Sequence, residues 1–453
     1  MKKGSIHEVQ IEDALKFPNI GIGISSDRKI AIKGGLPGQR LRVQIFRKGK
    51  VPKAQILEVL EPAPQEITPP CPVFGLCGGC AFQQIPYEYE MELKEAMVRR
   101  VLEPLNLEYA FLPTIAAYST DGYRNKMEYS FGDDGKDGNL TLGMRKRGSF
   151  YEAVGAECCL LAHADFARIL EFTLAYFKER GETFHHRRLR TGALRHLVLR
   201  RGFSSGDILA NLVTAGDGDY SDYAAKLQEL PLEGRVEGIL NTVNNSLADA
   251  VVADDVRLLY GKDHYYEELD ELGLRFKVSA FSFFQTNTVM AQVLYKTIAE
   301  FAGDVADKTI FDLYCGTGTI GIYLSKFAKR VIGIELVEEA VEAARGNAAL
   351  NDVNNCEFIS GDVRKMVKEL DIKPDTIILD PPREGINPRA IPDILAFDAQ
   401  CIVYVSCKAT SMVDDLVAFM AAGYVVEKIK IIDMFPRTAN VEVVVGLRKE
   451  NLK

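Results

Sequence analysis

FDLYCGTGT, residues 311–319, is the stretch that decides the fold class of this chain. The run from Lys308 to Leu313 predicts a strand, and Gly316 and Gly318 let the backbone turn sharply into a helix that begins at Thr319. In open α/β sheets, a loop of this kind lies beside a ligand at the carboxyl end of the strand. The stretch therefore predicts a parallel sheet with a ligand site at its edge. A structural tight turn without a ligand is the alternative.

Strand and helix patterns alternate through the rest of the C-terminal part. A second helix is expected to begin near Val337, and further strands are predicted at 331–334, 357–359, 376–379, 402–405, 425–432 and 441–447. Such alternation means crossover connections and a mostly parallel sheet that is buried on both faces. Residues 276–453 are therefore expected to form one Rossmann-like domain.

The chain before this domain divides into two units. Residues 1–62 contain short alternating runs separated by glycine and proline, which predicts a small β-barrel. A proline-rich segment at 61–70 ends that pattern, and residues 63–275 mix short strands with a helical spacing at 87–105. The predicted fold class is α/β and multidomain: a small N-terminal β-barrel, a mixed α/β middle domain and the C-terminal Rossmann-like domain.

Composition limits the possible locations and partners. The 453 residues contain neither an apolar run of about 18 residues nor a charged and then apolar leader, so we expect a cytoplasmic protein without membrane contact. Nothing demands more than a monomer. The net charge of −8 disfavours nucleic acid on average, but residues 1–60 hold twelve Lys/Arg against five Asp/Glu. A second basic cluster contains Arg187, Arg188, Arg190, Arg195, Arg200 and Arg201. RNA binding and a solvated face are both open for these regions.

The second predicted strand indicates which ligand the glycine loop binds. It ends in Glu335, whose carboxylate can accept both hydroxyls of a ribose. The further glycine that would bring a helix N-terminus onto a diphosphate is missing, which favours S-adenosylmethionine over NAD. Asp362 follows the third strand, where it can touch the adenine or simply cap the next helix.

An aspartate and a cysteine follow the fourth and fifth strands. Asp380 comes after 376–379 and Cys407 after 402–405, so both are expected at the edge where the cofactor lies. A cysteine at a strand end is more often a small core residue. Here the polar neighbours Ser406 and Lys408 predict an exposed thiol with a lowered pKa.

A thiolate beside a methyl donor fits methylation of a pyrimidine at C5. That carbon is too weak a nucleophile to take a methyl group directly, but addition of a thiolate to C6 creates an enolate that can. A base must then remove the C5 proton so that the thiolate can leave, and Glu442, on a late strand, is the candidate. A surface carboxylate at a strand edge is the alternative for Glu442.

A second group of cysteines lies in the N-terminal half. Cys71, Cys77 and Cys80 fall within ten residues, and Gly78-Gly79 allows the chain to wrap a small inorganic centre. Structural zinc and a [4Fe-4S] cluster each ordinarily take four ligands. Cys158 or Cys159 is expected to supply the fourth. The spacing leaves iron-sulfur and zinc both open.

Together these motifs resemble the RNA 5-methyluridine methyltransferases, particularly the 23S ribosomal RNA type with an N-terminal TRAM barrel. The resemblance spans nearly the whole chain and rests on 283-FFQTNT-288, 312-DLYCGTGTIG-321, 380-DPPREG-385, 403-VYVSCKATS-411 and 433-DMFPRTANVE-442. It implies S-adenosylmethionine-dependent methylation of uracil C5 in structured RNA and a barrel that binds RNA. It also implies that Cys407 is the nucleophile and Glu442 the base.

The resemblance implies the other site residues as well. Gln285 and Asp380 would line the pocket for the cofactor and the uracil, and cofactor contacts fall at Tyr314, Thr319, Glu335 and Asp362. The resemblance favours a [4Fe-4S] cluster, with zinc as the alternative, on Cys71, Cys77, Cys80 and Cys159. One departure is Asn440, where the family often has a histidine two residues before its glutamate.

The chemistry requires a flipped-out uridine, because a stacked base cannot present C6 to Cys407 and C5 to the methyl donor together. We expect the barrel and the middle region, at 123–126 and 185–201, to grip the surrounding RNA. 23S ribosomal RNA is the first candidate and transfer RNA the second.

Three other functions are alternatives to uracil methylation. Cytosine-5 methylation is disfavoured because the loop at 380–383 has no cysteine, and amino-group methylation would need no nucleophile. The third alternative is a catalytically silent RNA-binding iron-sulfur protein.

Overall fold

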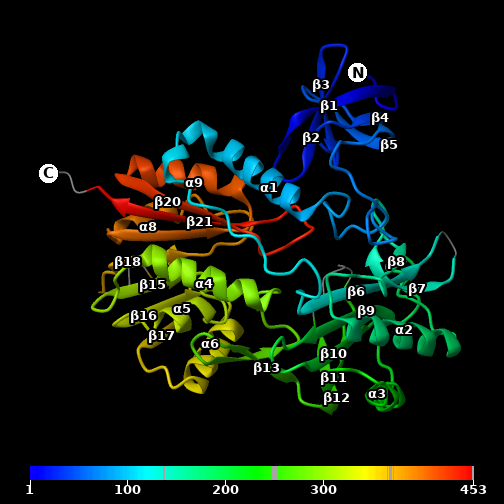
Figure 1. The fold of residues 1–453 in the computed structure, drawn as a ribbon. Helices are drawn as coiled ribbons and strands as arrows, with labels where there is room; N and C mark the ends of the chain where they lie inside the picture. The colour runs from blue at the N-terminus through cyan, green and yellow to red at the C-terminus, as the bar shows by residue number, and fades with distance from the viewer. Residues whose placement is uncertain (136–137, 247–252, 365, 367–369, 371, 451–453) are drawn as a thin grey trace.

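The computed structural model describes residues 1–135, 138–246, 253–364, 366, 370 and 372–450. It contains an N-terminal barrel, a central sheet and a C-terminal sheet, which Figure 1 shows in blue, in cyan to green, and in green to red. The predicted multidomain α/β class is confirmed. No helix among these residues is both long and apolar enough to span a bilayer.

The N-terminal strands close into a barrel in the order β1-β2-β3-β5-β4, with β4 paired back to β1. The strands are β1 (Ile6–Lys16), β2 (Ile20–Ser25), β3 (Arg28–Lys33), β4 (Arg40–Arg47) and β5 (Lys53–Glu61). Their alternating pattern turns Ile30, Ile32, Leu41 and Val43 into the barrel, where they form its core. The predicted barrel is confirmed.

The central sheet has the strand order β12-β11-β10-β9-β6-β7-β8. Its strands are β6 (Lys126–Asp133), β7 (Leu140–Arg145), β8 (Ala153–Gly155), β9 (Leu194–Arg201), β10 (Asp207–Thr214), β11 (Arg235–Val243) and β12 (Asp255–Gly261). Helices α2 (Ala164–Glu179) and α3 (Ser221–Gln228) share an apolar core with it. A hairpin of β13 (His264–Leu269) and β14 (Leu274–Ser279) leads to the C-terminal sheet.

The C-terminal sheet has the order β17-β16-β15-β18-β19-β21-β20. Its strands are β15 (Thr309–Leu313), β16 (Arg330–Glu335), β17 (Cys356–Ser360), β18 (Thr376–Leu379), β19 (Cys401–Ser406), β20 (Tyr424–Ile432) and β21 (Glu442–Lys449). Strands β15 to β19 pair in parallel, and β21 is antiparallel to both β19 and β20. The predicted mostly parallel sheet is confirmed.

Helices bury both faces of this sheet. One face packs against α4 (Thr288–Ala302), α5 (Thr319–Leu324) and α6 (Glu338–Leu350). The other packs against α8 (Ile391–Ala396), α9 (Ala409–Ala421) and α1 (Tyr87–Leu102).

Helix α1 comes from far earlier in the chain than the sheet it covers. Its Leu93, Met97 and Val98 are buried in the core of the C-terminal sheet. Figure 1 shows this helix beside α9. After two short turns, η1 (Glu103–Leu105) and η2 (Glu108–Ala110), the chain runs parallel to β20 at Phe111 and Ile115. This segment therefore contacts the C-terminal sheet, although it precedes the central one. The domain boundaries at 62 and 275 stay predictions.

Gly333 in the middle of β16 offers a test of this packing. A Cβ added there would lie 2.4 Å from Cδ1 of Phe358 and 2.9 Å from Sγ of Cys315. Gly333→Ala should therefore destabilise the fold by roughly 1–3 kcal/mol. The matched control is Gly346→Ala on the exposed side of α6, where nothing lies within 4 Å and alanine should stabilise the helix by up to ~1 kcal/mol. Urea unfolding followed by circular dichroism should separate the two variants, and equal midpoints would contradict the packing.

Candidate active site

Strand register brings the ends of three strands level at the carboxyl edge. β15 pairs in parallel with β16 on one side and with β18 on the other, so that Leu313 lies opposite both Ile334 and Leu379. The next residues of these strands, which are Tyr314, Glu335 and Asp380, leave the sheet at one level. The structure thus brings three predicted site residues together.

The antiparallel strand β21 brings the other two. Ser406, the last residue of β19, pairs with Val443. Continued by one residue, this register sets Cys407 opposite Glu442, and the charge of Glu442 acts on the Cys407 thiol. The thiol and the buried carboxylate therefore meet at the edge that carries the glycine loop.

The glycine loop adopts backbone conformations that few side chains tolerate. Tyr314, Gly316 and Gly318 have φ values of 66°, 53° and 78°. A Cβ on Gly318 would lie 2.7 Å from the Phe358 ring, whereas a Cβ on Gly316 would meet nothing within 4 Å. Gly318 is therefore needed for packing, and Gly316 leaves its backbone open to a ligand.

Glu335 is held beside this open backbone. Its Oε2 accepts the N–H of Gly316 at 3.1 Å, and its Oε1 accepts the N–H groups of Leu336 and Val337 at 2.8 and 3.0 Å. Leu336, which sequence reasoning missed, is 70% exposed. An exposed apolar side chain directly after the carboxylate offers a surface for a flat ring. Its position after Glu335 was the available signal.

The remaining predicted cofactor contacts lie close to this loop. Thr319 begins α5, and its Oγ1 accepts the hydroxyl of Tyr295 at 3.3 Å. Asp362 accepts the N–H of Arg364 at 3.0 Å, as a helix-capping residue would. Burial, and then the charge of Asp362, raise the pKa of Tyr314 to about 12, so the two side chains are neighbours.

A hollow of about 640 Å³ flanks the loop on the side of α6. Gly316, Thr317 and Asn347 line it, together with the rings of Phe281 and Phe283. These rings are 44% and 66% exposed, which is unusual for phenylalanine. The hollow extends the ligand site toward solvent.

Three carboxyl groups lie near this edge: Asp312 and Glu442 are buried, and Asp380 is half-buried. Burial, and then the charge of Asp380, raise the pKa of Asp312 to about 8, and burial raises the pKa of Asp380 to about 7. Burial and Asp380 also raise the pKa of Glu442 well above its usual range, while Arg383 lowers it. The charge of Asp380 thus acts on both of the other carboxyl groups.

The predicted lowered pKa of Cys407 is wrong for the free protein. Burial, and then the carboxylate of Glu442, raise the pKa of this half-buried thiol, and Asp380 adds to the effect. The guanidinium of Arg383 lowers it through its charge and a hydrogen bond. The polar neighbours do not activate the thiol: the Lys408 N–H donates to Ser406 Oγ at 3.2 Å and shapes the turn. Arg383 was missed as a site residue, although its place in 380-DPPREG-385 was a signal.

Gln285 is buried in the segment that leads into α4. The Nδ2 of Asn125 donates to the Gln285 carbonyl and to Thr288 Oγ1, each at 2.9 Å. The predicted RNA contact at 123–126 is wrong for Tyr123 and Asn125. Tyr123 is buried and donates to the Pro436 carbonyl at 3.1 Å, and Asn125 braces the Gln285 segment.

The basic cluster at 187–201 is also divided by the structure. Arg195 and Arg200 are 4% and 2% exposed and donate to backbone carbonyls, including those of Asn244 and Ala280. The prediction of an RNA-facing surface is therefore wrong for these two residues. Arg188 and Arg190 are exposed.

The cysteines at 71–80 and 158–159 gather in one place. Burial raises the pKa of Cys80 to about 12, and the charges of Cys159, Cys77 and Cys71 add to the effect. Cys158 lies within hydrogen-bonding reach of Cys71. In the described part of the chain, no three His, Cys, Asp or Glu side chains stand in metal-binding geometry. The donor set is nevertheless suited to a thiolate centre, since the Gly79 N–H points at Cys77 Sγ at 3.3 Å and the Gln83 amide at Cys80 Sγ at 3.2 Å.

Known proteins share this sequence and architecture. Residues 250–450 match the family described as tRNA (uracil-5-)-methyltransferase. An uncharacterized RNA methyltransferase of Clostridium tetani is 45% identical and covers 100% of this chain and 99% of its own length. The chain belongs to the RNA 5-methyluridine methyltransferase family. A further uncharacterized RNA methyltransferase, from Halalkalibacterium halodurans, is 30% identical to this methyltransferase. The alignment covers 100% of this chain and 98% of the relative.

A solved structure resembles the whole methyltransferase. The Pyrococcus abyssi tRNA (uracil-54, C5)-methyltransferase, in complex with S-adenosyl-L-homocysteine, superposes with a TM-score of 0.75 at 27% identity. The match covers 97% of this chain and 100% of the archaeal one, so the likeness extends from the barrel to the catalytic sheet.

The opposing effects on Cys407 predict how this methyltransferase reacts with alkylating agents. Arg383→Met removes the cation that lowers the thiol pKa, so the thiolate fraction at pH 8 should fall and alkylation of Cys407 by iodoacetamide should slow roughly three- to tenfold. Peptide mass spectrometry across a pH series measures this. Arg389→Met, at another exposed arginine after the same strand, is the control. An unchanged pH profile in Arg383→Met would mean that the guanidinium does not act on the thiol.

Proposed function

We propose that this enzyme transfers a methyl group from S-adenosylmethionine to C5 of a uridine in structured RNA through a covalent bond between Cys407 and C6. The observation that carries the proposal is the register of β19 against β21, which sets Cys407 opposite Glu442 beside the glycine loop. A nucleophile and a base so close to a cofactor loop suit reactions that need both.

The residues of the loop fit S-adenosylmethionine. Glu335 would accept the ribose hydroxyls, Leu336 and Asp362 would lie against the adenine, and the open backbone at Gly316 would admit the ligand. Tyr314, Thr319 and Gln285 complete the proposed contacts. The carboxyl groups of the buried Asp312 and the half-buried Asp380 suit the positive charge of a sulfonium. The ligand named for the archaeal relative is the demethylated form of the same cofactor.

The proposed chemistry has three steps. The Cys407 thiolate forms a bond to C6, and the ring electrons move to give an enolate with C5 as its nucleophilic carbon. The methyl group of S-adenosylmethionine is then transferred to C5, and the electrons of the broken S–CH3 bond stay on the sulfur of S-adenosylhomocysteine. Finally Glu442 takes the proton from C5, and as the electrons of that C–H bond form the C5–C6 double bond, the C6–S bond breaks and Cys407 leaves as the thiolate.

The surface offers two regions that support RNA binding. The turn between β4 and β5 and the strand ends that flank it carry Arg47, Lys48, Lys50 and Lys53, all of them exposed. On the central domain, Phe150 is 77% exposed, and the Tyr151 ring stacks on His186 at 4.4 Å beside Arg187 and Arg188. Positive charge suits the phosphates, and exposed rings suit unstacked bases.

Two RNA classes are candidates. The resemblance to the 23S ribosomal RNA type with a TRAM barrel makes 23S ribosomal RNA the first. The archaeal relative favours transfer RNA, because that protein is named as a tRNA methyltransferase and its likeness includes the barrel. A barrel alone therefore does not separate the two classes.

We further propose that Cys71, Cys77, Cys80 and Cys159 hold a [4Fe-4S] cluster, with zinc as the alternative. The gathering of these thiols and the N–H groups aimed at two of the sulfurs support the proposal. Methyl transfer from a sulfonium needs no electron, so the cluster would serve structure or RNA positioning.

Two substitutions test the chemistry on unmodified 23S ribosomal RNA and transfer RNA transcripts with labelled S-adenosylmethionine. Cys407→Ala should lose all uracil methylation. Glu442→Gln should slow turnover about 100- to 10,000-fold, because the C5 proton stays in place. It should also accumulate a covalent RNA–protein complex that survives denaturing electrophoresis.

The RNA that becomes labelled identifies the substrate class. Full activity of Cys407→Ala would rule out the covalent route and favour amino-group methylation. A wild-type protein that labels neither RNA would favour a silent RNA-binding protein.

The metal proposal has an internal control in two adjacent cysteines. The protein purified without air should contain about four iron ions per chain and show the broad visible absorption of a [4Fe-4S] cluster. Cys159→Ser should lose the iron and the absorption, whereas Cys158→Ser should retain both. Zinc in place of iron would select the alternative, and equal loss in both variants would contradict Cys159 as the sole fourth ligand.

A further inference from the structure

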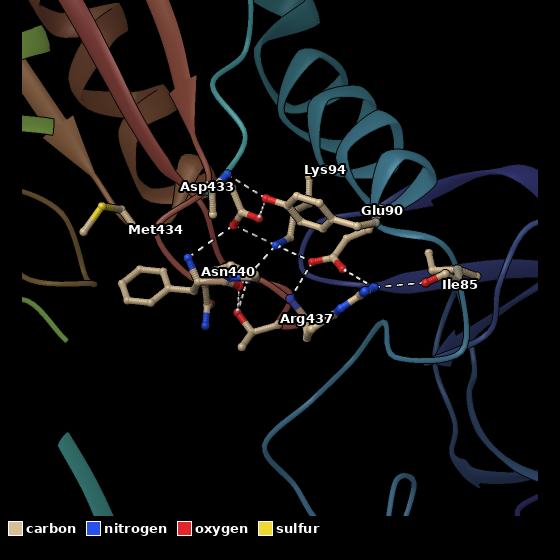
Figure 2. Close-up of polar contacts among 12 residues, drawn as sticks. Ile85, Glu90, Lys94, Asp433, Met434, Arg437 and Asn440 are labelled. Atoms are coloured by element: carbon tan, nitrogen blue, oxygen red, sulfur yellow. Dashed lines mark hydrogen bonds and ion pairs between the residues drawn. The ribbon is translucent and has the colours of Figure 1, made fainter. Parts of the chain in front are cut away.

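The connection between β20 and β21 decides where Glu442 lies. Glu442 is the first residue of β21, so the loop at 433–441 is its immediate approach from β20. Figure 2 shows that this loop is fastened to helix α1 by side chains from both partners. Helix α1 lies more than three hundred positions earlier in the sequence, as the separation of 339 between Lys94 and Asp433 shows.

Lys94 of α1 lies at the centre of these contacts. Its Nζ is 2.7 Å from Oε1 of Glu90 and 2.9 Å from Oδ1 of Asp433, and it donates to the Phe435 carbonyl at 3.2 Å. The side chains of Lys94, Glu90 and Asp433 are all 0% exposed. Burying such charges costs several kcal/mol per ion. Well-packed apolar residues in their place often stabilise a core equally well or better. Stability alone therefore does not explain this choice of residues.

Arg437 joins the middle of the loop to the same helix. Its backbone N–H donates to Glu90 Oε1 at 2.7 Å, and its Nη1 donates to Glu90 Oε2 at 3.3 Å and to the Ile85 carbonyl at 3.0 Å. Its φ of 65° lies in the left-handed region, which an arginine seldom occupies. The Glu90 carboxylate thus accepts hydrogen bonds from both the backbone and the side chain of Arg437, which fixes the path of the loop.

The segment after Cys80 and the first residue of α1, Tyr87, hold the same loop. The Arg437 carbonyl accepts the N–H groups of Ala81 at 2.7 Å and Phe82 at 3.2 Å, directly after Cys80. The Tyr87 hydroxyl donates to Asp433 Oδ2 at 2.8 Å and accepts the Ala117 N–H at 2.7 Å. The loop is therefore tied at its start and at its middle, which leaves Glu442 little freedom.

We propose that Glu90, Lys94, Asp433 and Arg437 form a positioning cluster that holds Glu442 where it can reach the C5 proton. Through the Arg437 carbonyl, the same cluster fastens the cysteine segment at 71–82 to the catalytic loop. The inference rests on the proposed function, in which Glu442 is the base. None of the four residues touches the reacting atoms, so they act through the loop.

A displaced base has a signature that general unfolding lacks. Thiol addition and methylation do not need Glu442, but release does, because the C6–S bond breaks only after the C5 proton has gone. A loosened loop should therefore leave the enzyme bonded to methylated RNA. A variant that merely unfolds should form no such complex.

Arg437→Ala tests this directly. Alanine has the same cost as arginine at a φ of 65°, so the substitution removes the side-chain contacts and leaves the backbone preference unchanged. Turnover should fall roughly ten- to a hundredfold, since a misplacement of about 1 Å can cost that much. The first methyl transfer should stay within a few-fold of wild type, and the covalent complex should accumulate on ordinary uridine RNA, as in Glu442→Gln.

Controls make each outcome informative. Arg389→Ala, at an exposed arginine outside the cluster, should behave as wild type, and Arg437→Lys should restore part of the turnover. Tyr87→Phe removes one bond to Asp433 and should give a smaller accumulation of the same complex, even if Arg437→Ala fails to fold. Hydrogen exchange over 79–85 and 433–442 should quicken in Arg437→Ala.

Accumulation in Glu442→Gln, together with normal release in both Arg437→Ala and Tyr87→Phe, would overturn the positioning role. Failure of Glu442→Gln itself to accumulate the complex would remove the base assignment and this inference with it.

Discussion

The antiparallel insertion of β21 between β19 and β20 is the constraint on which the site depends. The parallel strands of the sheet end at the same edge, and their following loops supply the cofactor residues. A parallel last strand would end there too, but β21 begins there instead, so its first side chain can face the residue after β19. Because β21 runs antiparallel to β19, Cys407, which follows the end of β19, has Glu442 at the start of β21 as its partner.

The electrostatics of the edge follow from this crowding. Asp312 and Glu442 are buried and Asp380 is half-buried, and burial favours the protonated forms of all three. The carboxylates and burial also raise the thiol pKa, and Arg383 is the cation that opposes them. A site with this excess of acidic groups is better suited to a bound cation than to a bound anion. The site of the free protein therefore favours a positively charged ligand. The positive charge of that ligand would in turn lower the pKa of the Cys407 thiol and favour the thiolate.

Much of this could be predicted from the sequence where the signal is local. The strand and glycine pattern around residue 311 gave the sheet, and short alternating runs gave the barrel, because neighbours in sequence decide those elements. The residues at strand ends, such as Asp380 and Cys407, could be placed at one edge for the same reason. The predicted RNA contacts of Arg195, Arg200 and Tyr123 were wrong. Each of these side chains donates a hydrogen bond to a backbone carbonyl far along the chain, and the sequence does not reveal such a partner. The predicted direction of the Cys407 pKa shift was wrong for a related reason. The prediction rested on the sequence neighbours Ser406 and Lys408, whereas burial and the distant Glu442 are the largest causes of the shift.

Long-range contacts also mean that the catalytic site does not depend on the C-terminal domain alone. Helix α1 and the cysteine segment belong in sequence to the N-terminal half, yet they cover and brace the catalytic sheet. The ionic groups involved balance, with Glu90 and Asp433 against Lys94 and Arg437, so the buried charges compensate one another only when both halves are assembled. Because an unpaired buried charge is costly, a loop in the wrong place would be penalised by several kcal/mol. The same contacts that hold the two halves together therefore restrict the catalytic loop to one arrangement.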